Sequence, residues 1–289
     1  GEITDESTEI RTRVVLEGRN IVGFRVESVG LRYEAYMNGV RVARSEKKGV
    51  SLNRDNTTIH LSAYIDRSRL LRWWHTHVNS GERTRLVIKP HVTVDLPSVD
   101  LSAFDLVGLG VPPARPPVSS VSVETLNYAT EFTTGILESI RTDERMTATA
   151  FGRTVFAVHG IDARWGEADE KETPIELRVR VENPNPFAVG LEDVGYTVSM
   201  NGVRVGKGSV EDFRLGARET KVVSSEAVLR NERIADWWTT HLQRGEKTET
   251  EISLAGAVRA LGLGRKIGDR SYTGSFETDL FGGGGLLDS

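Results

Sequence analysis

The chain has 289 residues, 38% of them hydrophobic and 27% charged, with a formal net charge of −4. This length suits two domains of ordinary size, each able to bury its own core. The acidic balance argues against a nucleic-acid partner, because such binding needs clustered cationic side chains. The sequence has no cysteine, which excludes disulfides and thiolate sites. No stretch approaches the roughly 20 apolar residues that span a bilayer.

The sequence repeats itself at an offset of about 164 residues, which organises its other features. Three segments match in the same order: Gly1–Glu17 with Gly166–Glu182, Tyr33–Ala43 with Tyr196–Gly206, and Leu70–Thr84 with Ile234–Thr248. A nearly constant offset over three matches indicates a tandem duplication. We call the two halves copy one and copy two.

A fourth match, Ser139–Asp143 with Ser275–Asp279, is expected to mark the final strand of each copy. Its offset is 136 residues, so copy one should carry about 28 extra residues around positions 97–132. That region includes the sequence VPPARPPVSS, which is typical of an extended loop. We therefore predict a first domain over 1–148 with this proline-rich insertion, a second over 155–282, and a flexible tail over 283–289.

Strands are predicted from strict two-residue alternation, which is clearest just after residue 174. Ile175, Leu177, Val179 and Val181 would face a core, and the Glu and Arg residues between them would face water. This pattern is typical of a half-buried antiparallel strand.

Two Asn-Pro steps, Asn183-Pro184 and Asn185-Pro186, follow that strand. The prolines remove two backbone donors, so the strand must kink or stop there. We expect both asparagines to bond back to the backbone at the kink. Copy one has Gly18-Arg19-Asn20 at the aligned positions, so the motif is specific to copy two.

Asn-Gly pairs predict one tight hairpin in each copy. Asn38-Gly39 and Asn201-Gly202 both stand between alternating apolar residues. Both positions of a type I′ turn need positive φ, which Asn and Gly tolerate best.

One amphipathic helix is predicted in each copy, capped by Asp66 or Asn231 and ending at Gly81 or Gly245. Its apolar arc carries a pair of tryptophans, Trp73 and Trp74 in copy one and Trp237 and Trp238 in copy two. An apolar arc favours docking of the helix on a surface. An exposed aromatic binding platform is the alternative.

These elements predict a mainly β (α+β) chain with two tandem antiparallel β-sandwich domains of immunoglobulin or fibronectin type, each bearing one helix. We expect no enzymatic activity, and we predict no catalytic, cofactor-binding or metal-binding residue. His75 and His77 are two apart on a helix, whereas helical metal pairs need a spacing of three or four. His77 and His241 lie on the apolar arc, which favours hydrogen-bonded structural histidines.

Copy two resembles the water-stress-and-hypersensitive-response (WHy) domain of the group 2 late embryogenesis abundant proteins. The resemblance rests on the strand that leads into Asn183-Pro184-Asn185, the hairpin YTVSMNGVRVGKG, the helix RIADWWTTHLQRGE and the final SFETDLFG. The tandem arrangement looks like that of archaeal desiccation-related members. The resemblance implies a helix-bearing β-sandwich without catalytic activity, linked to water or salt stress.

The resemblance to the archaeal members also implies an N-terminal hydrophobic segment, which such proteins often carry. Gly1 aligns with Gly166, which follows a further strand in copy two. We therefore expect the natural protein to be anchored in a membrane by a segment ahead of Gly1, with both domains outside the cytoplasm.

Two functions are compatible with this sequence. The first is a non-enzymatic stress-protection or interaction module that acts on a partner protein or a membrane. The second is a carrier of a lipid or another apolar ligand. A continuous cavity lined by Val179, Val181, Trp238 and Leu242 would favour the carrier, and a close-packed interior would favour the module.

Overall fold

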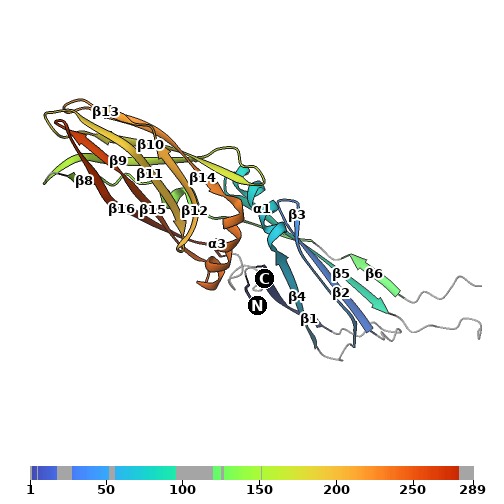
Figure 1. Cartoon of the computed structure of the whole chain (residues 1–289). Helices are drawn as coiled ribbons and strands as arrows, with labels where there is room; N and C mark the ends of the chain where they lie inside the picture. The colour runs from blue at the N-terminus through green and yellow to red at the C-terminus, as the bar shows by residue number, and fades with distance from the viewer. Residues whose placement is uncertain are drawn as a thin grey trace, which may run out of the picture. The chain divides into compact units, whose positions relative to one another are not determined.

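The computed structural model of the chain describes residues 2–4, 6–17, 28–51, 56–95, 120–124, 127–150 and 152–279 (Figure 1). It forms two compact units: unit 1 comprises Gly1–Glu2, Ser7–Asp66 and Arg85–Thr130, and unit 2 comprises Ile3–Glu6, Arg67–Thr84 and Glu131–Ser289. Unit 2 therefore contains all of copy two together with the helix of copy one. The predicted proline-rich loop and the predicted tail at 283–289 lie outside the described residues.

The strands of copy one form two antiparallel sheets. Their bounds are β1 Ser7–Glu17, β2 Ser28–Met37, β3 Val40–Val50, β4 Asn56–Asp66, β5 Arg83–Asp95, β6 Ser120–Glu124 and β7 Tyr128–Thr133. β1 pairs with β4, and the second sheet has the order β3-β2-β5-β6 with β7 also on β5. Both sheets contribute buried apolar side chains, such as Leu31 from β2 and Ile59 from β4. β6 and most of β7 fall within the predicted insertion.

Unit 2 is built around one long antiparallel sheet in the order β16-β15-β11-β12-β14-β10-β9-β8, with β13 also on β11 (Figure 1). Its strands are β8 Met146–Ala150, β9 Arg153–Trp165, β10 Glu172–Glu182, β11 Val189–Met200, β12 Val203–Val210, β13 Phe213–Leu215, β14 Thr220–Arg230, β15 Lys247–Ala260 and β16 Leu263–Glu277. Its helices are α1 Arg67–Asn79, α2 Ile136–Ile140 and α3 Asn231–Gln243. The fold is mainly β and antiparallel, as predicted.

The long sheet curls until its two edge strands meet. β8 and β16 contact each other, yet the described residues form no ladder between them. The sheet thus encloses an interior but leaves a seam along one side, which we call the β8–β16 seam.

Strand β10 shows the predicted alternation. Ile175, Leu177 and Val181 are buried, whereas Glu176 and Arg178 are exposed. β10 pairs with β14 on one side and β9 on the other. One face is therefore packed and the other is wet.

The two Asn-Gly hairpins form where the sequence predicts them. Asn38 and Gly39 have φ of 47° and 80°, and Asn201 and Gly202 have φ of 51° and 80°. Both turns connect directly paired strands, β2 with β3 and β11 with β12.

The predicted final strand of copy one is wrong. Ser139 lies in helix α2, whereas Ser275 lies in strand β16. The structural counterpart of Thr278 is Thr134, because each hydroxyl hydrogen bonds to the Nε2 atom of its copy's buried histidine. Thr278 follows Thr134 by 144 residues, so copy one has about 20 extra residues rather than 28.

The predicted cap of α3 is also wrong. Asn231 is the first residue of the helix, and no side-chain bond caps its N-terminus. The Asn231 Oδ1 atom accepts from Thr173 at 2.7 Å, and its Nδ2 atom donates to the Asp169 carbonyl at 2.7 Å. The side chain therefore joins the helix to the start of β10 and to the turn before it, instead of to the helix backbone.

Candidate functional site

The four tryptophans form one buried cluster between α1 and α3. The ring centroids of Trp73 and Trp238 are 5.3 Å apart, and those of Trp74 and Trp237 are 5.9 Å apart. Both pairs have edge-to-face geometry, which suits the quadrupoles of the rings. None of the four side chains is more than 2% exposed. The tryptophans therefore dock two helices together and offer no accessible platform.

A chain of hydrogen bonds connects α1 to β5, the strand that follows it, and the donor and acceptor of each bond can be assigned. Trp73 Nε1 donates to Thr84 Oγ1 at 2.8 Å, and that hydroxyl lies 2.8 Å from His77 Nδ1. His77 Nε2 lies 3.0 Å from Thr134 Oγ1, which donates to Glu82 Oε2 at 2.9 Å. Since the Thr134 proton goes to the carboxylate, His77 Nε2 must be the protonated nitrogen and Nδ1 the acceptor.

Copy two contains the same chain of hydrogen bonds. Trp237 Nε1 donates to Thr248 Oγ1 at 2.8 Å, which meets His241 Nδ1 at 2.8 Å. His241 Nε2 lies 2.8 Å from Thr278 Oγ1, and Thr278 donates to Glu246 at 2.9 Å. Burial lowers the pKa of His77 and of His241 from 6.5 to about 4. Both rings are therefore neutral structural groups, and both nitrogens of each ring are occupied.

Glu82 also holds the short helix α2. Its carboxylate accepts from the backbone N–H groups of Ile136 at 2.6 Å and Leu137 at 2.8 Å, and from Trp165 Nε1 at 3.0 Å. Glu82 was not among the residues predicted from the sequence. Glu82 and Glu246 occupy equivalent places in the matched segments SGERT and RGEKT, and that repetition is the signal that could have found them.

The Asn-Pro-Asn motif closes one end of unit 2. Asn183 Nδ2 donates to the carbonyls of Phe187 and Gly216, each at 2.7 Å. Asn185 Nδ2 donates to the carbonyls of Thr154 and Val155, each at 3.1 Å. We call this cluster the NPN corner.

The two asparagines of the NPN corner also bond to each other. The Asn183 Oδ1 atom accepts from the backbone N–H of Asn185 and from Asn185 Nδ2, each at 3.0 Å. Both side chains are buried. The corner thereby joins three chain segments at the start of β9, the end of β10 and the turn before β14. Pro184 and Pro186 lie within the same loop.

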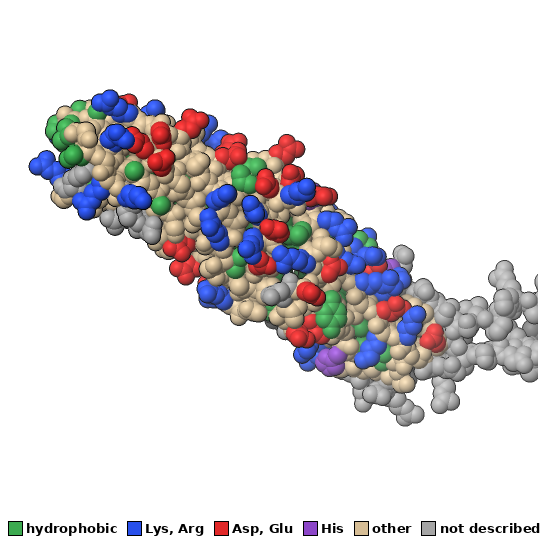
Figure 2. All heavy atoms as spheres, viewed as in Figure 1, with side chains coloured by type: hydrophobic (Ala, Val, Ile, Leu, Met, Phe, Trp, Pro, Cys, Tyr) green, Lys and Arg blue, Asp and Glu red, His purple; other side chains and the backbone are tan. Residues whose placement is uncertain are grey.

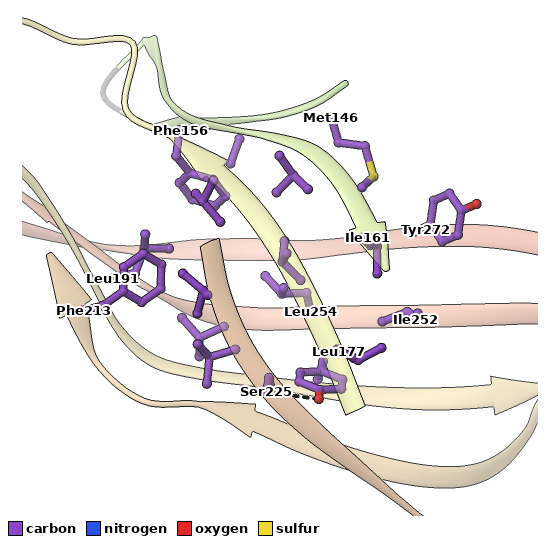
Figure 3. Close-up of a pocket in the computed structure, with 18 of the residues that line it drawn as sticks. Met146, Phe156, Ile161, Leu177, Leu191, Phe213, Ser225, Ile252, Leu254 and Tyr272 are labelled. Atoms are coloured by element: carbon purple, nitrogen blue, oxygen red, sulfur yellow. Dashed lines mark hydrogen bonds between the residues drawn. The ribbon is translucent and has the colours of Figure 1, made fainter. Parts of the chain in front are cut away.

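The curled sheet encloses an apolar cavity of about 350 Å³ (Figure 3). Its lining comes from β8, β9, β10, β11, β12, β13, β14, β15 and β16, and no lining side chain is charged. The lining residues are Met146, Thr147, Ala148, Phe156, Val158, Ile161, Leu177, Val179, Val181, Leu191, Val194, Tyr196, Val210, Phe213, Val223, Ser225, Ile252, Leu254, Ser271 and Tyr272.

A pair of hydrogen-bonded hydroxyl groups, from Tyr196 and Ser225, lies in the mostly apolar wall. Ser225 Oγ donates to the Ser209 carbonyl at 2.7 Å, so the Tyr196 hydroxyl is the donor in its 2.8 Å bond to Ser225 (Figure 3). Burial raises the pKa of Tyr196, so its phenol stays neutral.

The cavity approaches the surface at the β8–β16 seam. Its lining there includes Met146 and Thr147 from β8 and Ser271 and Tyr272 from β16. Met146 and Tyr272 are half-buried, whereas Thr147 and Ser271 are exposed. In Figure 3, Met146, Ile161 and Tyr272 lie on the same side of the cavity. Three of the five hydroxyl-bearing lining residues, Thr147, Ser271 and Tyr272, therefore lie at the opening.

The cavity differs from the one the carrier hypothesis describes. Val179 and Val181 line it, but Trp238 belongs to the tryptophan cluster and Leu242 is not in the lining. Among the residues that the structure describes, no cluster of three His, Cys, Asp or Glu side chains could hold a metal ion. The same part of the chain has no helix long and apolar enough to cross a bilayer.

Comparison with solved structures gives only remote likenesses. A protein from Archaeoglobus fulgidus is 22% identical, with a TM-score of 0.38 over 43% of this chain and 98% of its own. A β-glucuronidase from Bacteroides uniformis is 13% identical, with a TM-score of 0.28 over 94% of this chain. The match spans about a quarter of that enzyme, or 26%. At TM-scores below 0.5, neither likeness carries an argument.

Comparison with curated proteins found no match. The scan of protein families found one: residues 178–270 match the LEA_2 model, described as late embryogenesis abundant protein. The matched segment runs from β10 to β16. It includes Asn183 and Asn185 of the NPN corner, α3 and most strands around the cavity, so the similarity to late embryogenesis abundant proteins is confined to this part of unit 2.

Proposed function

We propose that this protein is a non-enzymatic water-stress protein of the tandem WHy type whose unit 2 binds an apolar molecule. The observation that carries the proposal is the cavity of about 350 Å³ with an uncharged, mostly apolar lining. Its volume falls at the lower end of the range of small-molecule sites. That size suits one apolar chain rather than a bulky ligand.

The energetics of an empty cavity support an occupant. Cavities in protein cores cost about 24 cal/mol for each Å³, so an unfilled interior of this size would cost several kcal/mol. A ligand with one apolar chain would remove that cost and would keep a polar end at the hydroxyls of the β8–β16 seam. The uncharged lining contains no acid or base for catalysis, which supports binding rather than a reaction.

The stress association and the location come from the family resemblance. The LEA_2 match over 178–270 supports a role in stress at the level of the family. Within the proposal, the protein works outside the cytoplasm, anchored to a membrane, and takes up or shields an apolar molecule when water is scarce.

Adjacent residues of β14 offer a matched test. Val223 lines the cavity, whereas Val222 is 55% exposed on the other face of the strand. We expect the protein to bind a fluorescent fatty acid with a stoichiometry of one. Val223→Trp fills the cavity and should weaken binding at least tenfold, whereas Val222→Trp should bind like the unchanged protein.

Native mass spectrometry of the purified protein complements this titration. A co-purifying mass of lipid size that Val223→Trp loses and Val222→Trp keeps would support the proposal. If the unchanged protein neither binds the probe nor carries an extra mass, the proposed ligand binding is wrong and the interaction module is the better description.

A further inference from the structure

Among the residues that the structure describes, three two-residue hairpin turns have positive φ at both central positions. Two are the Asn-Gly turns, and the third is Leu261-Gly262 between β15 and β16, where Ala260 pairs with Leu263. Leu261 and Gly262 have φ of 51° and 79°, close to the 51° and 80° of Asn201 and Gly202. One turn geometry is therefore made twice with asparagine and once with leucine.

Leucine is an unfavourable residue at this position. Positive φ brings Cβ close to the backbone, and asparagine tolerates this better than larger aliphatic residues do. Leu261 is also 73% exposed and Leu263 is 61% exposed, so neither side chain contributes much to the core. Folding alone would favour Asn-Gly here, as in the other two turns. A residue that breaks a local rule without a packing gain points to a functional demand.

Basic side chains flank these leucines. The segment from Ala255 to Lys266 contains Arg259, Arg265 and Lys266 and no acidic residue. Arg259 pairs across the hairpin with Gly264, and Arg265 with Val258, which places the charges within about 10 Å of the turn.

The neighbouring strand extends this positive charge. Arg214 on β13 and Arg259 on β15 both pair with Gly190 of β11 from opposite sides. They therefore flank one strand, about 10 Å apart. Glu192, one of the acidic residues near them, forms an ion pair with Arg259 at 2.8 Å. The end of unit 2 at the upper left of Figure 2 shows hydrophobic side chains beside Lys and Arg.

We propose that Leu261, Gly262 and Leu263, here called the leucine turn, dock unit 2 on a bilayer that contains anionic lipids. The two leucines would enter the interface between headgroups and acyl chains, and the arginines and Lys266 would contact the phosphates. Apolar burial and attraction to anionic lipid act together in such interfacial binding. The charge complementarity favours a membrane over a second copy of this chain. The inference goes beyond the proposed function and does not depend on an occupied cavity.

The absence of cysteine in the chain makes a site-specific probe straightforward. Leu263→Cys carries an environment-sensitive fluorophore at the leucine turn, and Lys247→Cys carries it at the other end of the same strand pair. Vesicles with about 30% phosphatidylglycerol should shift the emission of the first label to the blue and leave the second unchanged. Vesicles of phosphatidylcholine alone should give a much smaller shift at Leu263→Cys. Equal shifts at both positions, or with both lipids, would overturn the proposal.

The decisive variant is Leu261→Asn, which recreates the turn found at Asn201-Gly202. It should keep or raise the melting temperature, because it relieves strain, and should weaken sedimentation with anionic vesicles at least tenfold. Val15→Ser, which removes a 47% exposed valine from β1, is the control and should bind normally. Unchanged vesicle binding of Leu261→Asn would overturn the proposal. Loss of a dimer instead of vesicle binding would also do so, since it would assign the turn to a second copy.

Discussion

The two copies share a strand plan but differ at one pair of strands. In copy two, β12 and β14 form a ladder in which Gly206 pairs with Leu229 and Gly208 pairs with Ala227. In the part of copy one that the structure describes, the equivalent strands β3 and β4 belong to separate sheets. The long curled sheet and its cavity therefore belong to copy two.

Glycine explains this difference. A Cβ atom at Gly208 would lie 2.4 Å from the Glu226 carbonyl oxygen and 2.3 Å from the Tyr196 hydroxyl, so β12 can approach β14 only without a side chain there. Copy one has Ser45 at the aligned position, and its hydroxyl donates to the Ser62 carbonyl at 2.6 Å. In copy one, a side-chain hydrogen bond connects β3 with β4, whereas in copy two the equivalent strands β12 and β14 form a backbone ladder.

The tyrosines of the two copies follow the same difference. Tyr196 reaches over Gly208 to Ser225 of β14, whereas the hydroxyl of Tyr33 accepts from Thr12 of β1 at 3.3 Å. Gly206 and Gly208 of β12 thus allow copy two to form one curled sheet, whereas copy one, without these glycines, forms two separate sheets.

The largest effect is expected from Gly208→Ser, which gives copy two the residue of copy one. The new side chain would overlap Tyr196 and the Glu226 carbonyl, so β12 and β14 must separate. Overpacking of this kind costs typically 1–3 kcal/mol and occasionally more, and we expect about 3 kcal/mol because a backbone atom is involved. Urea unfolding measures the loss, and the fatty-acid probe should bind more weakly.

The reciprocal change, Ser45→Gly, tests the same comparison from copy one. It removes one hydrogen bond, which costs about 1 kcal/mol, and creates no clash. If Gly208→Ser were as mild as Ser45→Gly, steric exclusion would not be the reason that the sheets differ.

A smaller effect is expected at the NPN corner. Asn183→Ala leaves the carbonyls of Phe187 and Gly216 without this donor and removes the acceptor for Asn185. Losses of this type cost about 1–3 kcal/mol, and we expect about 2 kcal/mol together with a lower melting temperature of unit 2.

Asn20→Ala changes the asparagine that copy one retains at the aligned position and is the matched control. We expect it to lower the melting temperature of the first domain less than Asn183→Ala lowers that of the second. Equal shifts would mean that the motif is not a specialised corner of copy two.

Local patterns in the sequence predicted much of this fold. Alternation placed β10, Asn-Gly pairs placed two hairpins, and the apolar arcs placed four buried tryptophans, because each signal depends on neighbouring residues alone. The repeat failed at Ser139, where matching letters lie on a helix in one copy and on a strand in the other. The correct alignment of the two copies follows from the hydrogen bonds of Thr134 and Thr278 to the buried histidines. These partners are far apart in the sequence, so local patterns do not predict the bonds.

The cavity could be predicted only in part. Val179 and Val181 line it because they follow the alternation, but its shape depends on how β12 approaches β14. That approach depends on what a Cβ at Gly206 or Gly208 would meet, which is a property of the folded sheet. Glu82 was missed for a similar reason, since its partners lie more than 50 residues away in sequence.

The smallest difference between the copies is expected at a feature that they share, the buried histidines His77 and His241. Each ring titrates at about 4 when folded against 6.5 ordinarily, so the unfolded state binds more protons between these values. Stability is therefore highest above pH 6.5 and is lost as the pH falls towards 4, by about 2 kcal/mol for each histidine at pH 5. The two histidines together lower the free energy of unfolding between pH 7.5 and pH 5. His77→Gln should remove about half of that decrease, and His241→Gln should remove the other half. Because the hydrogen-bond chains match, the two variants should change it equally, and unequal changes would show that the copies differ here as well as at β12.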